Sequence, residues 1–226
     1  MKILVACEES QAVTIAMRKL GLEAYSCDLI PCSGGHPEWH ILQDVSPLLN
    51  GCCRFKTCDG SEHYVSERWD MIIAFPPCTY LTNAGAVRMR VKGKIVANRY
   101  IKAMEAKAFF MCFLTADCEK IAVENPTPLK IVDLPPCTQV IQPWQFNHPY
   151  TKRTCLWLKG LPPLVPTGII TEGVTPWVNG GFKDAHGNYR RFHGRRERDP
   201  INRAKTFPGI AAAMADQWGT LLGGKA

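Results

Sequence analysis

The sequence contains no run of about 20 uninterrupted apolar residues, which excludes a transmembrane helix. A signal peptide is also lacking, because residues 1–5 enter an apolar strand at once and are followed by Glu8 and Glu9, without a longer apolar region or a small-residue cleavage site. We therefore expect a cytoplasmic protein. No internal repeat divides the 226 residues, so a single domain is the simplest organisation.

The sequence has no C-x2-C pair, the spacing typical of structural zinc sites. The pattern formed by Cys52, Cys53, Cys58 and His63 lacks paired knuckles, and the residues around Asp59-Gly60 are typical of a hairpin. We expect no metal. Without a signal peptide, the 11 cysteines are expected to be reduced. They are residues 7, 27, 32, 52, 53, 58, 78, 112, 118, 137 and 155.

The chain carries a net charge of +7, which is compatible with a polyanionic partner. Basic residues gather in one segment, at Lys183, Arg190, Arg191, Arg195, Arg196, Arg198, Arg203 and Lys205. Aromatic residues are interspersed there, at Trp177, Phe182, Tyr189 and Phe192. The mixture is typical of phosphate contacts combined with base stacking, and a solvated basic loop is the competing interpretation.

Hydrophobic patterns predict strands alternating with helices. We expect strands at residues 2–7, 22–27, 41–42, 71–75, 121–123 and 154–158, and helices at 11–20, 98–116 and 210–222. This alternation predicts an α/β fold with a mostly parallel sheet covered by helices on both faces.

Polar residues follow five of the predicted strands, at Glu8, Asp28, Asp44, Cys78 and Glu124. Taken singly, each has a structural explanation, such as a buried thiol or a helix cap. Ligands in parallel sheets bind beyond the carboxyl ends of the strands. The shared placement of these residues therefore indicates an active edge.

Three motifs, taken in this order, resemble the cytosine-C5 DNA methyltransferase family. They are FPPC at 75–78, EN at 124–125 and FNHPYTKRTCLWL at 146–158. The chain is more closely similar to short phage-type cytosine methyltransferase-like proteins, through IIAFPPCTYLTNAG, HPYTKRTCLWLKGLPPL and KTFPGIAAAMADQWG, over residues 1–165 and 203–219. The resemblance implies a class I, Rossmann-like methyltransferase fold over residues 1–226, with a reduced recognition segment at about 161–205.

The resemblance also implies catalytic roles. Cys78 would add to cytosine C6, since a thiolate is intrinsically nucleophilic, and this addition activates C5 towards a methyl donor. Glu124 would engage the base at N3 and the exocyclic amine. Arg153, with Lys152, would steady the base carbonyl or a phosphate. A cytosine in duplex DNA would first have to be flipped out of the helix.

The implied methyl donor is S-adenosyl-L-methionine, bound across the ends of the first four strands. Asp28 would take the ribose hydroxyls and Asp44 the adenine amine, while Pro76 would line the donor side. The other implied contacts are Cys7, Glu8, Glu9, Ser10, Leu29 and Val45. In the family, the segment matching KTFPGI, at 205–210, closes this pocket.

The implied partner is DNA. In the family, the loop after the nucleophile closes over the flipped base. The corresponding residues expected to contact DNA are Thr79, Asn83, Arg88 and Arg90, with Lys92 and Lys94 beside them. The basic segment adds Arg190, Arg191, Arg195 and Arg196. A solvated loop is again the competing interpretation. We expect a monomer.

Two departures from the family leave alternatives open. Residues 7–12 contain no glycine where the family has a glycine-rich turn, which favours a non-catalytic DNA-binding protein with a degenerate donor site. The recognition segment is only about 45 residues long, which favours a substrate smaller than duplex DNA, such as a free or single-stranded pyrimidine nucleotide.

Overall fold

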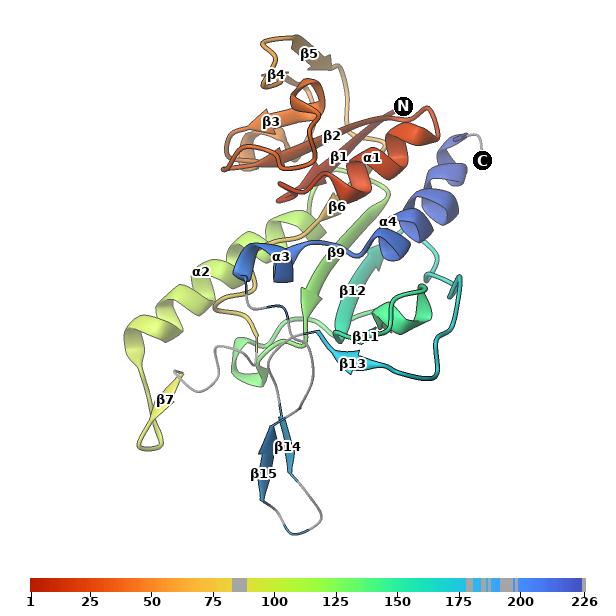
Figure 1. Cartoon of the computed structure of the whole chain (residues 1–226). Coiled ribbons are helices and arrows are strands. Elements are labelled where there is room, and N and C mark those ends of the chain that lie inside the picture. Colours follow the sequence, from red (N-terminus) through yellow and green to blue (C-terminus); the bar gives the residue numbers. More distant parts are fainter. Residues whose placement is uncertain are drawn as a thin grey trace.

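A seven-stranded sheet forms the centre of the molecule (Figure 1). This computed structural model describes residues 1–82, 89–177, 181–183, 186, 188–191, 197 and 199–224. The strands lie in the spatial order β10 (Gln139–Ile141), β12 (Thr154–Lys159), β9 (Ile121–Pro126), β6 (Met71–Ala74), β1 (Lys2–Ala6), β2 (Glu23–Asp28) and β3 (His40–Leu42). From β3 to β9 every neighbouring pair is parallel, whereas β12 is antiparallel to both β9 and β10.

β1 and β6 are neighbours at the point where the order of the strands reverses. The chain runs from β1 outward to β2 and β3, then returns to β6 and continues on the other side to β9. Doubly wound sheets bind their ligands beyond the carboxyl ends of the strands at such a reversal. A ligand site is therefore expected at the two loops that begin at Cys7, after β1, and at Phe75, after β6.

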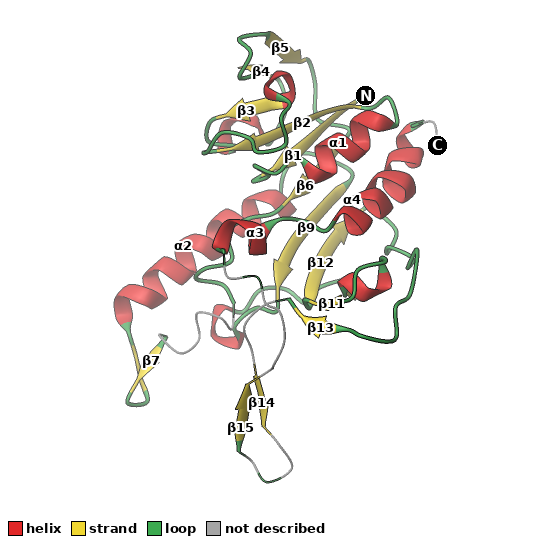
Figure 2. Cartoon of the chain, viewed as in Figure 1, coloured by secondary structure: helices red, strands yellow, loops and turns green. Residues whose placement is uncertain are grey.

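Successive residues of the central strands face opposite sides of the sheet, as strand geometry requires. The longer helical segments are α1 (Ala12–Lys19), α2 (Ala97–Leu114), α3 (Pro200–Ala204) and α4 (Pro208–Met214). Ile3 and Val5 pack in one core cluster with α1 and α4, whereas Leu4 and Ala6 pack in a second cluster with α2 (Figure 2). The predicted mostly parallel sheet with helices on both faces is confirmed.

The far side of the sheet differs from the prediction. β9 was expected to stop at residue 123 but continues through Glu124 and Asn125 to Pro126, because β12 pairs with it along its whole length. β10 was not predicted, since its three residues carry too short a pattern to be recognised. The family-like Glu-Asn pair therefore lies inside a paired strand end rather than in a loop.

The predicted C-terminal helix changes its type along its length. α4 ends at Met214, and a π-helical turn at Ala215–Gly219 and a 3-10 turn at Thr220–Leu222 follow it. Other short 3-10 turns lie at Pro37–Trp39, Ser46–Leu48, Lys130–Val132 and Pro143–Gln145. In the described parts of the chain, no helix combines the length and apolarity needed to cross a membrane.

Small two-stranded sheets lie outside the central one. They are β4 (Cys53–Lys56) with β5 (Glu62–Val65), β7 (Arg90–Val91) with β8 (Lys94–Ile95), β11 (Tyr150–Thr151) with β13 (Thr175–Pro176), and β14 (Gly181–Lys183) with β15 (Tyr189–Arg191). The first confirms the hairpin predicted around Asp59-Gly60. Figure 1 shows the β7–β8 and β14–β15 hairpins projecting from the end of the molecule at which β9 terminates.

Candidate active site

The loop after β6 carries Cys78, the predicted nucleophile. It leaves the sheet through a hydrogen bond of 3.0 Å from the Phe75 amide to the Ala6 carbonyl. Pro76 is buried and Pro77 exposed, and their rings restrict the backbone on the approach to Cys78. The Cys78 carbonyl then accepts hydrogen bonds from the amides of residues 81 and 82, at 3.1 and 3.2 Å, so that a helical turn begins at Cys78. Its thiol is half-buried.

Asn125 joins the end of β9 to this loop. Its side-chain amide donates a hydrogen bond of 2.8 Å to the Pro76 carbonyl, and the side chain is fully buried. The Asn125 Oδ1 atom is also buried, and it has no hydrogen-bond partner among the residues that the structure describes. Because Ala74 of β6 pairs with Val123 of β9, the two strand ends lie next to each other. Asn125 therefore sets the Cys78 loop against the strand that carries Glu124.

Opposed charges surround the Cys78 thiol. Burial raises its pKa and the Glu124 carboxylate raises it further, whereas Lys152 and Arg203 lower it. Burial also raises the pKa of Glu124, against the opposing effects of Lys152 and the Thr154 hydroxyl. The structure thus brings together three predicted catalytic residues, Cys78, Glu124 and Lys152. It adds Arg203, which the sequence analysis did not select because it is one of many basic residues in that segment.

Lys152 and Arg153 lie in different environments. The Lys152 ammonium donates a hydrogen bond of 2.9 Å to the Arg203 carbonyl, and its main-chain amide donates one of 2.9 Å to Gln142 Oε1. Arg153 is exposed, and its Nε donates a hydrogen bond of 3.0 Å to the Thr127 hydroxyl, in the turn after β9. Lys152 is therefore the cation held beside the thiol.

The segment after α3 connects both sides of the candidate site. Lys205 Nζ lies 3.9 Å from a carboxylate oxygen of Glu9. The Gly209 amide donates a hydrogen bond of 2.9 Å to His148 Nε2, and the ring centroids of His148 and Phe207 are 5.0 Å apart. A Cβ at Gly209 would lie 2.0 Å from the Phe146 carbonyl oxygen, so only glycine fits there. The HPYTKR and KTFPG motifs are thus in direct contact.

The predicted donor residues at the ends of β2 and β3 occupy polar turns. Asp28 accepts hydrogen bonds from the amides of Leu29, at 2.7 Å, and Ile30, at 3.3 Å. Asp44 accepts from the amide and hydroxyl of Ser46, each at 2.8 Å, which lowers its pKa. Burial is the largest effect on Asp28 and raises its pKa. Leu29, which follows β2, is 74% exposed at the edge of the sheet. Val45, in the turn after β3, is buried in the core.

Cys7 lies close to both of these carboxylates. Burial raises the pKa of its thiol, and Asp28, Cys27 and Asp44 raise it further. The first loop therefore approaches the ends of β2 and β3, and the Glu8 amide donates a hydrogen bond of 3.2 Å to the Cys27 carbonyl. Ser10, also predicted there, is half-buried, and its carbonyl lies close to Gly34.

The glycine-free first loop adopts left-handed backbone conformations at two residues. Cys7 and Gln11 both have φ of 57°, a region that glycine enters without cost. Gln11 is held there by a pair of hydrogen bonds, because its Nε2 donates to the His36 carbonyl at 2.8 Å and its Oε1 accepts from the His36 amide at 3.1 Å. Side-chain bonding thus stabilises a backbone conformation that would otherwise favour glycine.

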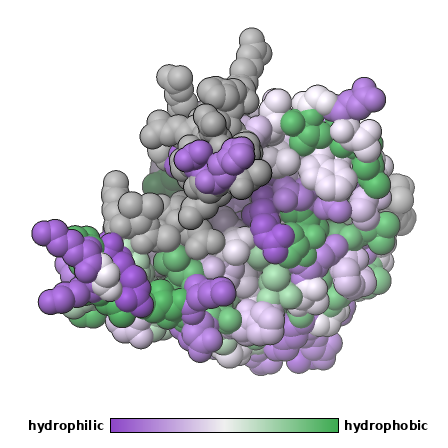
Figure 3. Space-filling view, turned by 90° about the horizontal axis from the view of Figure 1, so that it is seen from below, coloured by the Kyte–Doolittle hydropathy of each residue, from purple (hydrophilic) through white to green (hydrophobic). Residues whose placement is uncertain are grey.

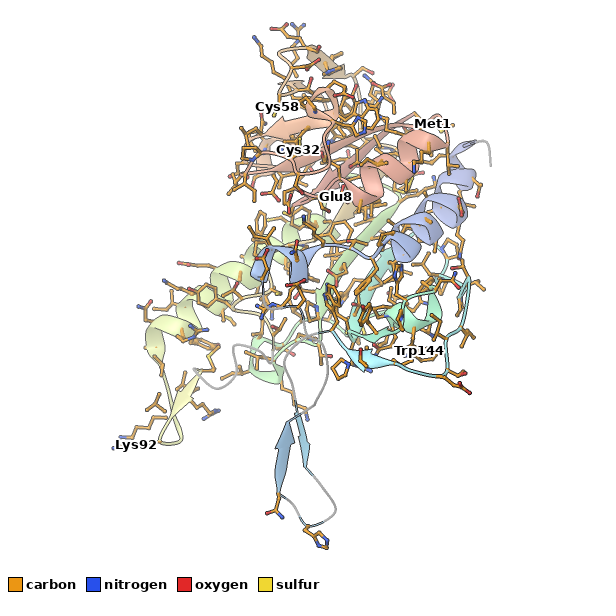
Figure 4. All side chains as sticks on the ribbon, in the orientation of Figure 1. Met1, Glu8, Cys32, Cys58, Lys92 and Trp144 are labelled. Atoms are coloured by element: carbon orange, nitrogen blue, oxygen red, sulfur yellow. The ribbon has the colours of Figure 1, made fainter. Side chains whose placement is uncertain are left out.

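Glu8 caps helix α1. Its carboxylate accepts hydrogen bonds from the Val13 amide at 2.7 Å, the Thr14 amide at 3.2 Å and the Thr14 hydroxyl at 2.7 Å. Figure 4 labels Glu8 at the end of the sheet beside α1. The side chain is only 3% exposed, and burial raises its pKa to about 7. Glu8 therefore takes the orphan amides of the helix N-terminus, where the positive end of the helix dipole favours an anion.

The predicted DNA contacts are placed only in part. Thr79 is exposed next to Cys78, and Arg90 is exposed on β7. Arg190 and Arg191 lie on β15, in the hairpin that projects from the carboxyl edge. The predictions for Asn83, Arg88, Arg195 and Arg196 lie outside the described residues.

The cysteine and histidine pattern around β4 and β5 has other bonding partners. His63 Nδ1 lies 2.9 Å from the Tyr25 hydroxyl and its Nε2 lies 3.1 Å from the Thr57 hydroxyl. Within the described ranges, no group of three or more metal-ligating side chains is found. All 11 cysteines are free.

The similarities found for this chain are to solved structures. No protein-family model and no curated protein sequence matches the chain. Among solved structures, it is similar to an E. coli crystal structure described as a candidate DNA modification methyltransferase encoded within a prophage, with 12% identity and a TM-score of 0.44. The similar region covers 75% of this chain and 52% of that one, so this chain spans about half the length of the other protein. At this level the similarity carries no argument about activity.

Proposed function

We propose that the chain is an S-adenosylmethionine-dependent methyltransferase that acts on C5 of a cytosine in DNA through a covalent adduct with Cys78. The observation that carries the proposal is the grouping of Cys78, Glu124 and Lys152 at the ends of adjacent strands. A thiol, a carboxyl group with a raised pKa and a cation are the groups that addition of a thiolate to a pyrimidine requires.

Each of these side chains has a defined task in the proposed reaction. The Cys78 thiolate forms a bond to C6, and the displaced electron pair makes C5 nucleophilic. Burial raises the pKa of Glu124, which favours its protonated form, and this carboxyl group would donate a proton to N3 as charge develops there. C5 would then bond to the methyl group that the sulfonium donor supplies, and the donor would leave as a neutral thioether. Loss of the C5 proton to water would form the C5–C6 double bond again and expel Cys78 as a thiolate, while N3 returns its proton to Glu124.

Lys152 and Arg203 would support the thiolate. Their charges lower the pKa of Cys78, which burial and Glu124 raise. Lys152 cannot move freely, since its ammonium is bound to the Arg203 carbonyl at 2.9 Å. Both residues are therefore assigned to stabilising the anionic sulfur.

The fold supports a methyl donor at the strand reversal. The order β3-β2-β1-β6-β9 is that of a doubly wound nucleotide-binding sheet. With the antiparallel β12 at the far side, it resembles the class I methyltransferase fold. Asp28, Leu29 and Asp44 would hold the nucleoside, and the loop at Cys7 would border the rest of the donor. The donor supplies an electrophilic methyl group bound to a sulfonium.

One observation favours a second candidate function. The Glu8 carboxylate already accepts hydrogen bonds from the amides of Val13 and Thr14 at the N-terminus of α1, and its ionised form places a negative charge there. A donor that used those amides would be excluded, which favours a non-catalytic DNA-binding protein. Titration calorimetry with S-adenosylmethionine separates the two. Binding at or below millimolar donor supports the methyltransferase, and no binding supports the second candidate.

The direct test is transfer of a labelled methyl group. We expect Cys78→Ala to abolish incorporation, while Cys112→Ala, which removes an exposed thiol from α2, leaves it unchanged. Single-stranded DNA, duplex DNA and free dCMP are compared as acceptors, and base-resolution mapping of modified cytosines in host DNA reports the target. Unimpaired transfer by a folded Cys78→Ala variant would exclude the proposed mechanism.

A further inference from the structure

The chain has a long stretch without acidic residues around Cys78. Residues 71–104 contain no Asp or Glu, although the chain has 20 such residues in all. The same stretch contains the basic residues Arg88, Arg90, Lys92, Lys94, Arg99 and Lys102. Its charge is therefore entirely positive, which suits a polyanion next to the predicted nucleophile.

The described part of this stretch after the nucleophile loop forms a projection, which we call the cationic arm (residues 89–102). Met89 anchors its base, since it is 3% exposed and its carbonyl accepts a 3.0 Å hydrogen bond from the Val96 amide. Lys92 and Gly93 make the tight turn between β7 and β8, with φ of 48° and 78°. Figure 4 labels Lys92 at the tip, far from the sheet.

The charges of the cationic arm face solvent or the nucleophile loop. Among the described residues, no carboxylate lies within ion-pair distance of Arg90, Lys92 or Lys94. The guanidinium of Arg99 lies 4.9 Å from the ring centroid of Tyr80, and the ammonium of Lys102 lies 5.7 Å from it. Since Tyr80 is two residues after Cys78, these contacts connect the arm with the site.

Large apolar side chains are exposed between these cations. Val91 is 57% exposed, Ile95 45%, Tyr100 38% and Ile101 56%. In Figure 3 the projection at the left, which corresponds to the β7–β8 hairpin, shows hydrophilic and hydrophobic residues side by side. A surface that only met the phosphates of a duplex would have no use for exposed aliphatic groups, because a duplex stacks the apolar faces of its bases inside.

We infer that the cationic arm is a docking surface for single-stranded DNA. The phosphates of the strand meet Arg90, Lys92 and Lys94, and its unstacked bases cover the apolar side chains between them. The inference rests on the proposed function, because it names the form of DNA that reaches Cys78. A cytosine in a single strand also avoids most of the cost of unpairing and flipping.

Binding of fluorescent oligonucleotides of about 20 nucleotides tests the inference, at several salt concentrations around 0.15 M. The Cys78→Ala background removes covalent capture, and no donor is added, so the readout does not depend on methyl transfer. We expect the single strand to bind at least about tenfold more tightly than a duplex of the same sequence. Equal or tighter binding of the duplex would overturn the inference.

Three sets of variants separate charge from apolar contact. Arg90→Ala with Lys92→Ala and Lys94→Ala should reduce the salt slope for single strands by about 2, at roughly 0.7 per cation. A matched set, Lys19→Ala with Arg54→Ala and Lys56→Ala, removes the same charge from α1 and β4 and should leave the slope nearly unchanged. Equal effects of the two sets would refute docking at the arm.

Two variants test the apolar contacts. One combines Val91→Ser with Ile95→Ser in the β7–β8 hairpin, and the other is Ile101→Ser, which leaves the hairpin intact. Both should weaken single-strand binding by about tenfold and leave duplex binding unchanged. Unchanged single-strand binding in both, with unchanged melting temperatures, would contradict the inference.

If wild-type protein binds single strands through the arm but transfers no methyl group, the proposed function fails and the arm stands. If arm variants methylate single-stranded DNA at the wild-type rate, the arm fails and the proposed function stands.

Discussion

The side chain of Asn125 and the carbonyl of Pro76 are joined by a buried hydrogen bond of 2.8 Å. The bond connects two different strands at their carboxyl ends, immediately beside Glu124 and two residues before Cys78. The backbone also joins the two segments a few residues farther on, through a hydrogen bond of 2.7 Å from the Leu129 amide to the Leu81 carbonyl and a bridge between Thr82 and Pro128. The Asn125 amide is therefore one of several contacts that set the position of the Cys78 loop relative to Glu124.

We expect Asn125→Ala to destabilise the protein by about 1–3 kcal/mol, the cost of leaving the buried Pro76 carbonyl without its donor. The loosened loop should also expose Cys78, so that iodoacetamide modifies it faster. Urea unfolding measures the first effect, and peptide mass spectrometry at Cys78 measures the second. Gln139→Ala is the control, since it removes a pair of hydrogen bonds, of 2.7 and 2.8 Å, between the Gln139 side chain and the Leu164 backbone, away from Cys78. Equal acceleration in both variants would contradict a specific role for Asn125.

Arg203→Ala should move the alkylation midpoint of Cys78 to higher pH. Arg203 lowers the pKa of this thiol, so its removal leaves burial and Glu124 less opposed. Arg203→Lys keeps the charge and should retain most of the wild-type profile. Lys205→Ala removes a cation that pairs with Glu9 instead, and its midpoint should stay at the wild-type value. A shift in Lys205→Ala as large as that in Arg203→Ala would show a general charge effect.

The central strands and the residues that follow them could be predicted from sequence because their signals are local. Apolar runs such as residues 71–75 specify buried strands, and the polar residues after them lie at one edge by geometry. The orientation of β12 and the existence of β10 could not be predicted in this way, since both depend on pairing between distant segments. The same limit hid Arg203, which is distinguished from other arginines only by its position beside Lys152.

The first loop shows a different limit. The absence of glycine from residues 7–12, where the resembled family has a glycine-rich turn, favoured a degenerate donor site. The structure forms the turn with Cys7 and Gln11 at positive φ, because Gln11 is bonded to His36, 25 residues later. A long-range contact thus compensates for a local preference, and a single sequence does not reveal such contacts.

Glu8 should make stability fall as the pH rises through the neutral range. Its pKa is raised to about 7, so the folded protein holds a proton that the unfolded chain loses near pH 4.3. The stabilisation is fully present below about pH 4.3 and is lost as the pH rises to about 7. Relative to Glu8→Gln, we expect the stability of the wild type to fall by at most about 4 kcal/mol over this range.

Urea unfolding at a series of pH values measures this difference. Glu105→Gln, which neutralises an exposed carboxylate on α2, is the control and should follow the wild-type curve. A constant difference between wild type and Glu8→Gln from pH 4.5 to 7.5 would contradict the expected proton linkage of the cap.

His148 should impose the opposite pH dependence on the contact between the HPYTKR and KTFPG motifs. Burial lowers its pKa, and its Nε2 accepts the hydrogen bond from Gly209, which requires that nitrogen to be unprotonated. The contribution is therefore present above the unfolded pKa of about 6.5 and is lost as the pH falls below it.

His148→Gln keeps an acceptor that does not titrate, and its stability should change less between pH 7.5 and 5 than that of the wild type. His148→Ala should cost about 1 kcal/mol at pH 7.5 and remove the same pH dependence. Urea unfolding of the three proteins at matched pH values decides the matter, and parallel curves for wild type and His148→Gln would show that this histidine is not the titrating group.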